Sequence, residues 1–243
     1  MVKLSERFSH LAALVSQDAI LADVGTDHGY IPIYLIQTGR ISRAYAMDIG
    51  KGPLLRAKEH VQACGLGEYI TLRLSDGVAA LAPKEADSIL IAGMGGGVTL
   101  HILTEGEMVV KNAKELILQP QSEISRVREY LYANGYWIDR EDMVFEDGKY
   151  YPMMHVIPGG IKEHTTRHEK EAWEVIYRYG EQLLKDKNDV LHQYLLHSIE
   201  QYEMILANLT KANQTEAIEA RRKEISVELS YAKMALTYWK EGC

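Results

Sequence analysis

The most informative part of this sequence is residues 20–30, ILADVGTDHGY. Residues 20–24 form a short, mostly apolar run that ends at Gly25, a pattern typical of a buried strand. From about residues 30–37 the sequence continues as a helix, which Gly39 closes. We therefore expect a strand, a glycine-containing loop and a helix in direct succession.

The same alternation continues along the chain, after an N-terminal amphipathic helix marked by Leu4, Phe8, Leu11 and Val15. Further strands are expected at residues 44–47, 70–74, 88–92 and 115–120, and further helices at about 53–63 and 122–133. Strands that alternate with helices predict parallel βαβ units in a doubly wound α/β sheet. Strand-like residues 136–145 and 150–157 are separated only by a segment containing Asp147-Gly148, which predicts a hairpin.

The composition changes after Pro158-Gly159-Gly160, and no proline follows. Apolar side chains recur at helical spacing over residues 195–209 and again over residues 225–239. Two such runs joined by a short turn predict an antiparallel helical hairpin that resembles a coiled coil, although both stripes could instead pack on the preceding domain. We expect one domain over residues 1–160 and a helical domain over residues 161–243.

Composition and charge restrict the class of protein. Hydrophobic residues make up 47% and charged residues 25%, as in ordinary globular proteins, and the formal net charge is -7. This charge disfavours nucleic-acid binding through bulk attraction but allows a local basic patch. The two cysteines suggest neither a disulfide framework nor a metal site, and no signal peptide or membrane span is visible, so a cytoplasmic protein without a metal is expected. The sequence leaves the oligomeric state open, and a monomer is compatible with it.

The loop after the first strand is expected to bind a ligand, because ligands of such sheets lie at the carboxyl ends of the strands. A dinucleotide site would carry Gly-x-Gly-x-x-Gly, but Asp27 replaces the middle glycine, and its carboxylate would repel a diphosphate. S-adenosylmethionine carries a sulfonium and an ammonium and no phosphate. The carboxylates of Asp23 and Asp27 suit such a cation.

Residues at the other strand ends agree with this donor. Asp48 can accept hydrogen bonds from both ribose hydroxyls, and Asp76 from the exocyclic amine of adenine. The glycine run at residues 93–97 leaves space for donor and acceptor. Each feature alone could be a helix cap, a turn or a flexible loop, and their joint fit to one ligand favours S-adenosylmethionine. The predicted cofactor-binding residues are Asp23, Gly25, Asp27, His28, Gly29, Asp48, Ile49, Asp76, Gly77, Ala92, Gly93 and Met94.

These motifs resemble those of the bacterial tRNA (adenine(22)-N(1))-methyltransferase family, TrmK. Leu4-Ser5-Glu6-Arg7 and Leu118-Gln119-Pro120-Gln121 also fit, the AGMGGG of residues 92–97 is the most specific element, and the resemblance covers nearly the whole chain. It implies a Rossmann-like class I methyltransferase sheet, mostly parallel with an antiparallel terminal hairpin, and a C-terminal coiled-coil domain that helps to hold tRNA. It also implies methyl transfer from S-adenosylmethionine to N1 of adenine 22, with S-adenosylhomocysteine as the product.

The chemistry of adenine N1 guides the search for catalytic residues. This ring nitrogen has an available lone pair, so positioning matters more than a strong base. The base must leave its stack and enter a pocket, where Tyr30, Tyr150 and Tyr151 are candidates to receive it, although the two adjacent tyrosines could simply pack. Gln119 could orient the adenine or stabilise the turn before Pro120. The predicted catalytic residues are Asp27, Tyr30 and Gln119.

Basic side chains that could contact tRNA are scattered along the chain: Lys3, Arg7, Arg43, Lys51, Arg56, Arg126, Arg128 and the cluster Arg221-Arg222-Lys223. Because Glu219 and Glu224 flank that cluster, a solvated helix face is the alternative interpretation. Two other functions stay open from the residues alone, namely a methyltransferase acting on a small molecule and a nucleotide-binding module without catalysis.

Overall fold

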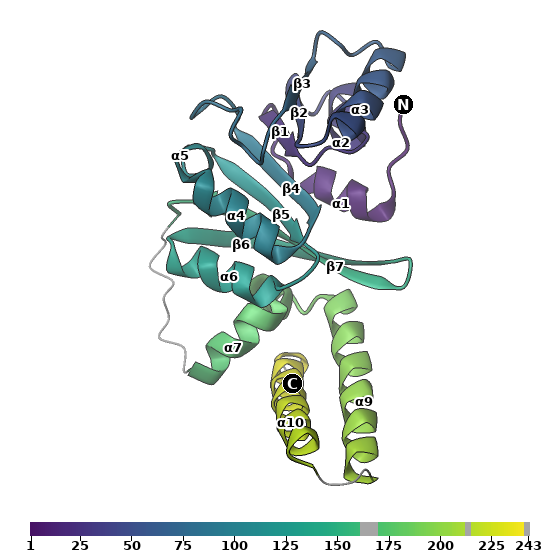
Figure 1. The fold of residues 1–243 in the computed structure, drawn as a ribbon, viewed down its shortest axis with the longest axis vertical. Coiled ribbons are helices and arrows are strands. Elements are labelled where there is room, and N and C mark those ends of the chain that lie inside the picture. Colours follow the sequence, from purple (N-terminus) through teal and green to yellow (C-terminus); the bar gives the residue numbers. More distant parts are fainter. Residues whose placement is uncertain (161–169, 212–214, 241–243) are drawn as a thin grey trace. The chain divides into compact units, whose positions relative to one another are not determined.

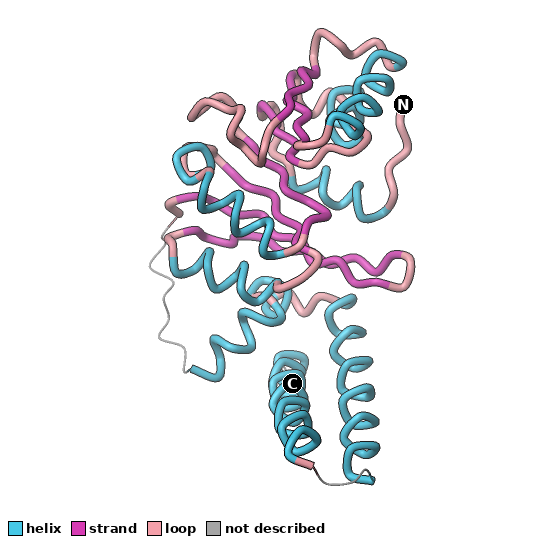
Figure 2. The backbone as a smooth tube through the Cα atoms, viewed as in Figure 1, coloured by secondary structure: helices cyan, strands magenta, loops and turns pink. Residues whose placement is uncertain are grey.

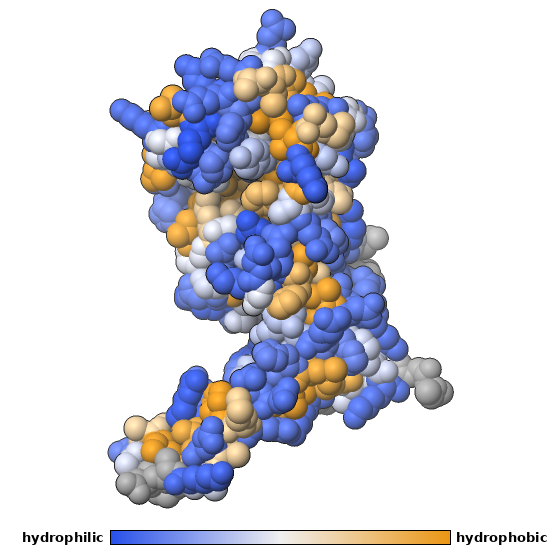
Figure 3. All heavy atoms as spheres, turned by 90° about the vertical axis from the view of Figure 1, so that its right-hand side faces the viewer, coloured by the Kyte–Doolittle hydropathy of each residue, from blue (hydrophilic) through white to orange (hydrophobic). Residues whose placement is uncertain are grey.

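The computed structural model describes residues 1–160, 170–211 and 215–240. The chain divides into two compact units, Met1–His164 and Thr165–Cys243. No helix in the described part is both long and apolar enough to cross a membrane. The face shown in Figure 3 is mostly hydrophilic, with smaller apolar patches between the polar side chains.

The first unit is built on a seven-stranded sheet with the strand order β3-β2-β1-β4-β5-β7-β6 (Figure 1). The strands are β1 Ile20–Val24, β2 Arg43–Asp48, β3 Ile70–Leu74, β4 Ser88–Met94, β5 Glu115–Pro120, β6 Tyr136–Glu146 and β7 Lys149–Pro158. Strands β1 to β5 pair in parallel, and β7 is antiparallel to both β5 and β6. The predicted mostly parallel sheet with a terminal hairpin is confirmed, and Figure 2 shows that hairpin extending beyond the other strands.

Two hydrophobic cores cover the two faces of this sheet. In β5, Leu116 and Leu118 lie in one core and Ile117 in the other, because successive side chains of a strand point to opposite faces. The helices of this unit are α1 Glu6–Leu14, α2 Tyr30–Gln37, α3 Lys51–Ala63, α4 Gly96–Glu105, α5 Glu107–Val110 and α6 Ile124–Ala133. Both faces of β5 are therefore buried, which explains why its sequence is apolar without alternation.

The strand order places the loops after β1 and β4 beside each other. Strand β1 pairs with β2 on one side and with β4 on the other, and Val24 is level with Ile91. After β1 the chain continues to β2 on one side of this point, and after β4 it continues to β5 on the other side. The two loops therefore lead to opposite faces of the sheet. Such a switch point is where doubly wound sheets bind their ligands.

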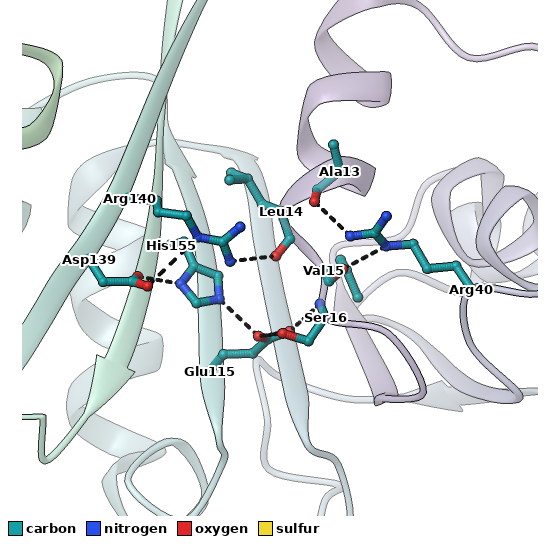
Figure 4. A network of polar contacts seen from close by, with 9 residues as sticks. All are labelled: Ala13, Leu14, Val15, Ser16, Arg40, Glu115, Asp139, Arg140 and His155. Carbon is teal, nitrogen blue, oxygen red and sulfur yellow. Dashed lines mark hydrogen bonds and ion pairs between the residues drawn. The ribbon is translucent and has the colours of Figure 1, made fainter. Parts of the chain in front are cut away.

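A buried polar network lies at the amino-terminal end of β5, at the edge of the sheet away from the loops after β1 and β4 (Figure 4). His155 of β7 is 3% exposed, bonds the Glu115 carboxylate through Nε2 at 2.8 Å and pairs with Asp139 through Nδ1. The pairing of β6 with β7 shifts its register between Ile138 and Arg140, so Asp139 is the extra residue of a bulge, which aims its side chain at His155. Burial opposes charge on the ring, but both carboxylates outweigh it and raise the pKa of His155.

The same network fixes the C-terminal end of α1 to the sheet. The Ser16 backbone N–H donates to Glu115 Oε1 at 2.9 Å. Arg40 donates from Nε to the Val15 carbonyl at 2.7 Å and from Nη2 to the Ala13 carbonyl at 2.9 Å (Figure 4). These bonds satisfy carbonyl groups that a helix end leaves without intrahelical partners. These hydrogen bonds therefore hold α1 in place on the first unit.

Five helices make up most of the described part of the second unit. They are α7 Lys170–Tyr179, α8 Glu181–Lys185, α9 Asp189–Lys211, α10 Glu216–Leu236 and the short 3-10 helix η1 Thr237–Trp239. Helices α9 and α10 pack against each other, and Lys233 Nζ lies 2.7 Å from Glu203 Oε1 across them. The two long helices are confirmed, whereas their coiled-coil character stays a prediction.

Candidate donor-binding and active site

The loop between β1 and α2 has a conformation that requires glycine. Gly25 and Gly29 have φ angles of +80° and +69°, in the left-handed region. The backbone N–H groups of Gly25 and Thr26 both donate to the Met47 carbonyl, at 2.8 and 2.9 Å, which ties the loop to β2. A Cβ at Gly25 would lie 2.2 Å from Met94 Cε, so the end of β4 also packs directly on this loop.

Asp23 brings a buried carboxylate to the base of this loop. Its side chain lies near the end of β1, and the residue is 8% exposed. Burial, together with the nearby Asp48 carboxylate, raises the pKa of Asp23 to about 6. A buried carboxylate with a raised pKa beside a strand end is a strong candidate for binding a cationic group.

Asp48 and Ile49 occupy the end of β2. Asp48 Oδ1 accepts from the Gly50 backbone N–H at 2.7 Å, and the Asp48 carbonyl accepts from the Ser75 N–H at 2.9 Å. The ends of β2 and β3 are thereby held together. Ile49 is 70% exposed, so an apolar side chain lies open to solvent directly beside the carboxylate.

Nine of the twelve predicted cofactor residues lie along two cavities. The first, which we name the donor-loop cavity, has a volume of about 310 Å³ and is lined by Arg7, Phe8, Asp23, Gly25, Thr26, Asp27, His28, Gly29, Tyr30, Ile31, Ala92, Gly93 and Gln121. The second has a volume of about 460 Å³ and lies between the loop after β3 and helix α4, with Asp76 and Gly77 in its wall. Asp48, Ile49 and Met94 line neither cavity.

Asp27 and Tyr30, two predicted catalytic residues, both line the donor-loop cavity. Arg56 of α3 donates from Nε to Asp27 Oδ1 at 3.1 Å, so Asp27 already has a cationic partner within the chain. The Tyr30 ring stacks with His28 and His60 at centroid distances of 5.1 Å each. Asp27 is thus better placed to orient Arg56 and the loop than to accept a proton, while Tyr30 offers an aromatic ring at the cavity wall.

Gln119, the third predicted catalytic residue, is fully buried and does not line the cavity. Its Oε1 accepts from Arg7 Nη1 at 3.3 Å. Its amide contacts Arg7, and a direct contact with the acceptor base stays a prediction. Gln121, two residues later, reaches the cavity in its place.

The other candidates for base stacking and tRNA contact have different surroundings. Tyr151 packs its ring on the Arg7 guanidinium, 4.8 Å from the ring centroid, and Tyr150 packs on Phe145. Neither tyrosine lines the donor-loop cavity. Arg128 is 1% exposed and pairs with Glu141 at 2.8 Å, so the expectation that it contacts tRNA is wrong.

Sequence reasoning did not assign Arg7, Phe8 and Gln121 to this site. Gln121 is the first residue after β5, and its position beyond a strand end was a usable signal. Arg7 and Phe8 belong to α1, which precedes the sheet in the chain. Helical periodicity shows which face of α1 is apolar but not that its first turn lies at the donor loop.

Comparisons with known proteins identify the family. A family model described as "Methyltransferase domain" matches residues 4–154. The tRNA (adenine(22)-N(1))-methyltransferase of Bacillus subtilis is 31% identical over 237 residues, which cover 98% of both chains. The crystal structure of B. subtilis TrmK superposes with a TM-score of 0.84 over 97% of this chain and 99% of that one, at 31% identity. The Streptococcus pneumoniae protein Sp1610 in complex with S-adenosyl-L-methionine gives a TM-score of 0.82 at 33% identity, over 96% of this chain and 100% of that one. The fold, the motifs and these matches together establish that the chain belongs to the bacterial tRNA (adenine(22)-N(1))-methyltransferase family, TrmK.

Proposed function

We propose that this protein transfers the methyl group of S-adenosylmethionine to N1 of adenine 22 in tRNA. The observation that carries the proposal is the 31% identity to the B. subtilis enzyme of that activity, which spans 98% of both chains. Because the match includes the helices of the second unit, the whole chain and not only a donor-binding domain shares the relationship. A tRNA substrate also implies that the protein works in the cytoplasm.

The residues at the strand ends fit S-adenosylmethionine. Asp23 offers a buried carboxylate to the ammonium, and the side-chain-free backbone at Gly25 allows close approach. Asp48 uses only Oδ1 for the Gly50 N–H, which leaves Oδ2 for ribose hydroxyls. Asp76, in the wall of the second cavity, offers a carboxylate to the exocyclic amine of adenine. When bound there, S-adenosylmethionine supplies an electrophilic methyl group on a sulfonium.

The chain's own contribution to the reaction is positioning. Adenine N1 attacks with its lone pair, so no residue needs to remove a proton first. Phe8 and Tyr30 place aromatic rings at the wall of the donor-loop cavity, where a flipped base can stack. The methylated base is cationic, and the carboxylates of Asp23 and Asp27 in the same wall stabilise the positive charge as it develops.

The second unit is proposed to contact the tRNA. Arg222 and Lys223 are exposed on α10, while the neighbouring Arg221 pairs with Glu224 at 2.7 Å. Two exposed cations on one helix can meet phosphate groups despite the net negative charge of the chain.

A methyl-transfer assay tests the proposal. The purified protein is incubated with isotope-labelled S-adenosylmethionine and unmodified tRNA, and the labelled nucleotide is mapped by mass spectrometry. We expect label on N1 of adenine 22 and none when guanine replaces that adenine. If the protein binds the donor but labels no tRNA, the proposal is wrong.

A further inference from the structure

The order of the strands decides which part of the sheet edge is left for the methyl acceptor. The three carboxylates assigned to the donor, those of Asp23, Asp48 and Asp76, lie at or just beyond the ends of β1, β2 and β3. These strands are neighbours in the sheet, and β4 and β5 continue it on the other side of β1. A donor held by those carboxylates therefore leaves the ends of β4 and β5 to the acceptor base.

Gln121 is the first residue beyond β5 and lies on this acceptor side. Its backbone N–H donates to the Met94 carbonyl at 2.8 Å, which fixes the residue to the end of β4. It lines the donor-loop cavity, and its Nε2 atom lies 3.8 Å from where a Cβ on Gly93 would be. Gly93 is the extra residue of a bulge in β4, with a φ of +78°. Since Gly93 has no side chain, the space beside the Gln121 amide stays open.

The Gln121 amide has both a donor and an acceptor to offer. The residue is exposed, and no group in the described part of the chain forms a hydrogen bond with its side chain. The amide of Gln119 differs, because it is buried and accepts from Arg7. Oε1 accepts and Nε2 donates, side by side in one plane. Such an amide is complementary to a ligand edge on which a donor stands next to an acceptor.

Adenine has such an edge away from its reacting atom. Methyl transfer needs the lone pair of N1, so a group that identifies the base must leave N1 free. The Hoogsteen edge presents the N6 amine, a donor, beside N7, an acceptor, and a glutamine amide can pair with both at once. Guanine has the acceptor O6 in place of the amine, so the amide oxygen would face another acceptor. An amide on the Hoogsteen edge thus separates adenine from guanine and keeps N1 accessible.

We propose that Gln121 identifies the acceptor base, with Oε1 accepting from the N6 amine of adenine and Nε2 donating to N7. The inference rests on the transfer to adenine N1 given under the proposed function. It assigns base selection to the loop after β5, whereas donor binding belongs to the ends of β1, β2 and β3. The competing role for this amide is a contact with the donor.

Acceptors that differ only at N7 test the proposal. The values of kcat/KM are measured with tRNA that carries adenine or 7-deazaadenine, in which a C–H replaces N7, at position 22. We expect Gln121→Leu to lower kcat/KM for adenine about 5- to 150-fold, the discrimination that one bidentate pair supplies. The ratio of adenine to 7-deazaadenine should fall about 2- to 10-fold relative to the wild type, since one neutral hydrogen bond is lost. Use of this ratio cancels the difference in intrinsic reactivity between the two bases.

Two further variants sharpen the result. Gln121→Glu retains an acceptor for the N6 amine but has no donor for N7, so it should lower the same ratio. Gln62→Leu removes another exposed amide, on α3 and outside both cavities, and should leave kcat/KM and the ratio unchanged.

Calorimetry with S-adenosylmethionine distinguishes base recognition from donor binding. The proposal expects Gln121→Leu to bind the donor with wild-type affinity. An adenine to 7-deazaadenine ratio that stays at the wild-type value in Gln121→Leu would overturn the proposal, and so would weakened donor binding by that variant. Failure of the wild-type protein to methylate tRNA with adenine at position 22 would count against the proposed function itself.

Discussion

Asp23 in the wall of the donor-loop cavity is placed to bind a cation at the expense of the stability of the ligand-free fold. The pKa of Asp23 is about 6 in the folded chain, above the ordinary value of 3.8. The folded state therefore holds this proton more tightly than the unfolded state does, and Asp23 lowers the stability of the ligand-free protein as pH rises from about 4 to 6. At pH 7 the difference corresponds to about 3 kcal/mol at most.

Asp23→Asn is expected to raise the free energy of unfolding at pH 7, by up to about 3 kcal/mol, because it removes a desolvated charge. The same variant should bind S-adenosylmethionine much more weakly, since the ammonium loses its carboxylate. Urea denaturation at pH 7 and pH 4 measures the first effect, which should fade at the lower pH.

Asp27→Asn is the matched control for this substitution. Its carboxylate lies in the same loop but is 55% exposed and paired with Arg56, so its removal should change the free energy of unfolding little. A wild-type protein as stable as Asp23→Asn at pH 7 would show that burial of Asp23 costs nothing.

Residue types at strand ends could be predicted from the sequence, but contacts between distant segments could not. Asp23, Gly25 and Gly93 line the donor-loop cavity as expected, because a strand end fixes where its next residues lie. Arg7 was recognised only as one basic residue among many. Its place at the wall of the donor-loop cavity depends on where α1 packs, which no local pattern contains.

At the scale of elements, two loops approach each other closely beside the cavity. Helix α4 begins at Gly96, and a Cβ there would lie 2.4 Å from the Ser122 carbonyl oxygen and 2.8 Å from Glu123 Cβ. At the neighbouring Gly97, a Cβ would meet only the end of the Glu123 side chain, at 3.3 Å. Gly96, and not Gly97, therefore allows the loops after β4 and β5 to touch.

Gly96→Ala is expected to lower the free energy of unfolding by about 1–3 kcal/mol, since backbone atoms must move to admit the methyl group. Gly97→Ala should be neutral or stabilising, by up to about 1 kcal/mol, because alanine favours the helix. Thermal or urea denaturation of the two variants measures this difference in the free energy of unfolding. Equal destabilisation by both substitutions would contradict the steric argument.

The buried network of β5, β6 and β7 predicts a pH dependence. Because the pKa of His155 is raised in the folded state, its stabilising contribution is complete below the ordinary histidine value of 6.5 and is lost as pH rises through the higher folded value. His155→Gln is expected to lower the free energy of unfolding at pH 6 by about 3–5 kcal/mol, since it leaves buried Glu115 without its cation. Between pH 6 and 9 its stability should vary less than that of the wild type.

His10→Gln provides the comparison for that measurement. His10 also pairs with a carboxylate, that of Asp142, but its side chain is 40% exposed, so the substitution should cost less than about 1 kcal/mol. An unchanged pH profile in His155→Gln would show that another group titrates.

Helices and strands with regularly spaced apolar residues were predicted well, and irregular elements were not. Helix α2 spans residues 30–37 as expected, and the terminal hairpin follows its Asp147-Gly148 turn. Helix α4 was missed, because its first turn begins within a glycine run that reads equally well as a flexible loop. The bulge at Asp139 was missed as well, since one extra residue leaves almost no trace in an alternating pattern.

At the scale of the whole molecule, a chain of net charge -7 must act on a polyanion. Attraction must then come from local groups of cations, and the two units are expected to divide the work between donor binding and tRNA binding. A chain ending at Gly160 retains both hydrophobic cores of the first unit. It should bind S-adenosylmethionine like the full-length protein but methylate tRNA poorly.

Reversal of charge on α10 tests the second unit within the intact chain. Arg222→Glu combined with Lys223→Glu is expected to raise KM for tRNA about tenfold or more, with unchanged affinity for S-adenosylmethionine, because each lost phosphate contact weakens binding. The effect should shrink as salt is added, since salt already weakens these contacts in the wild type. Lys111→Glu with Lys114→Glu changes the charge equally, before β5 and at the amino-terminal edge of the strands, and should leave KM nearly unaltered. If both pairs of substitutions raise KM alike, net charge rather than a contact on α10 governs tRNA binding; if only the α10 pair does, the helices of the second unit hold the substrate.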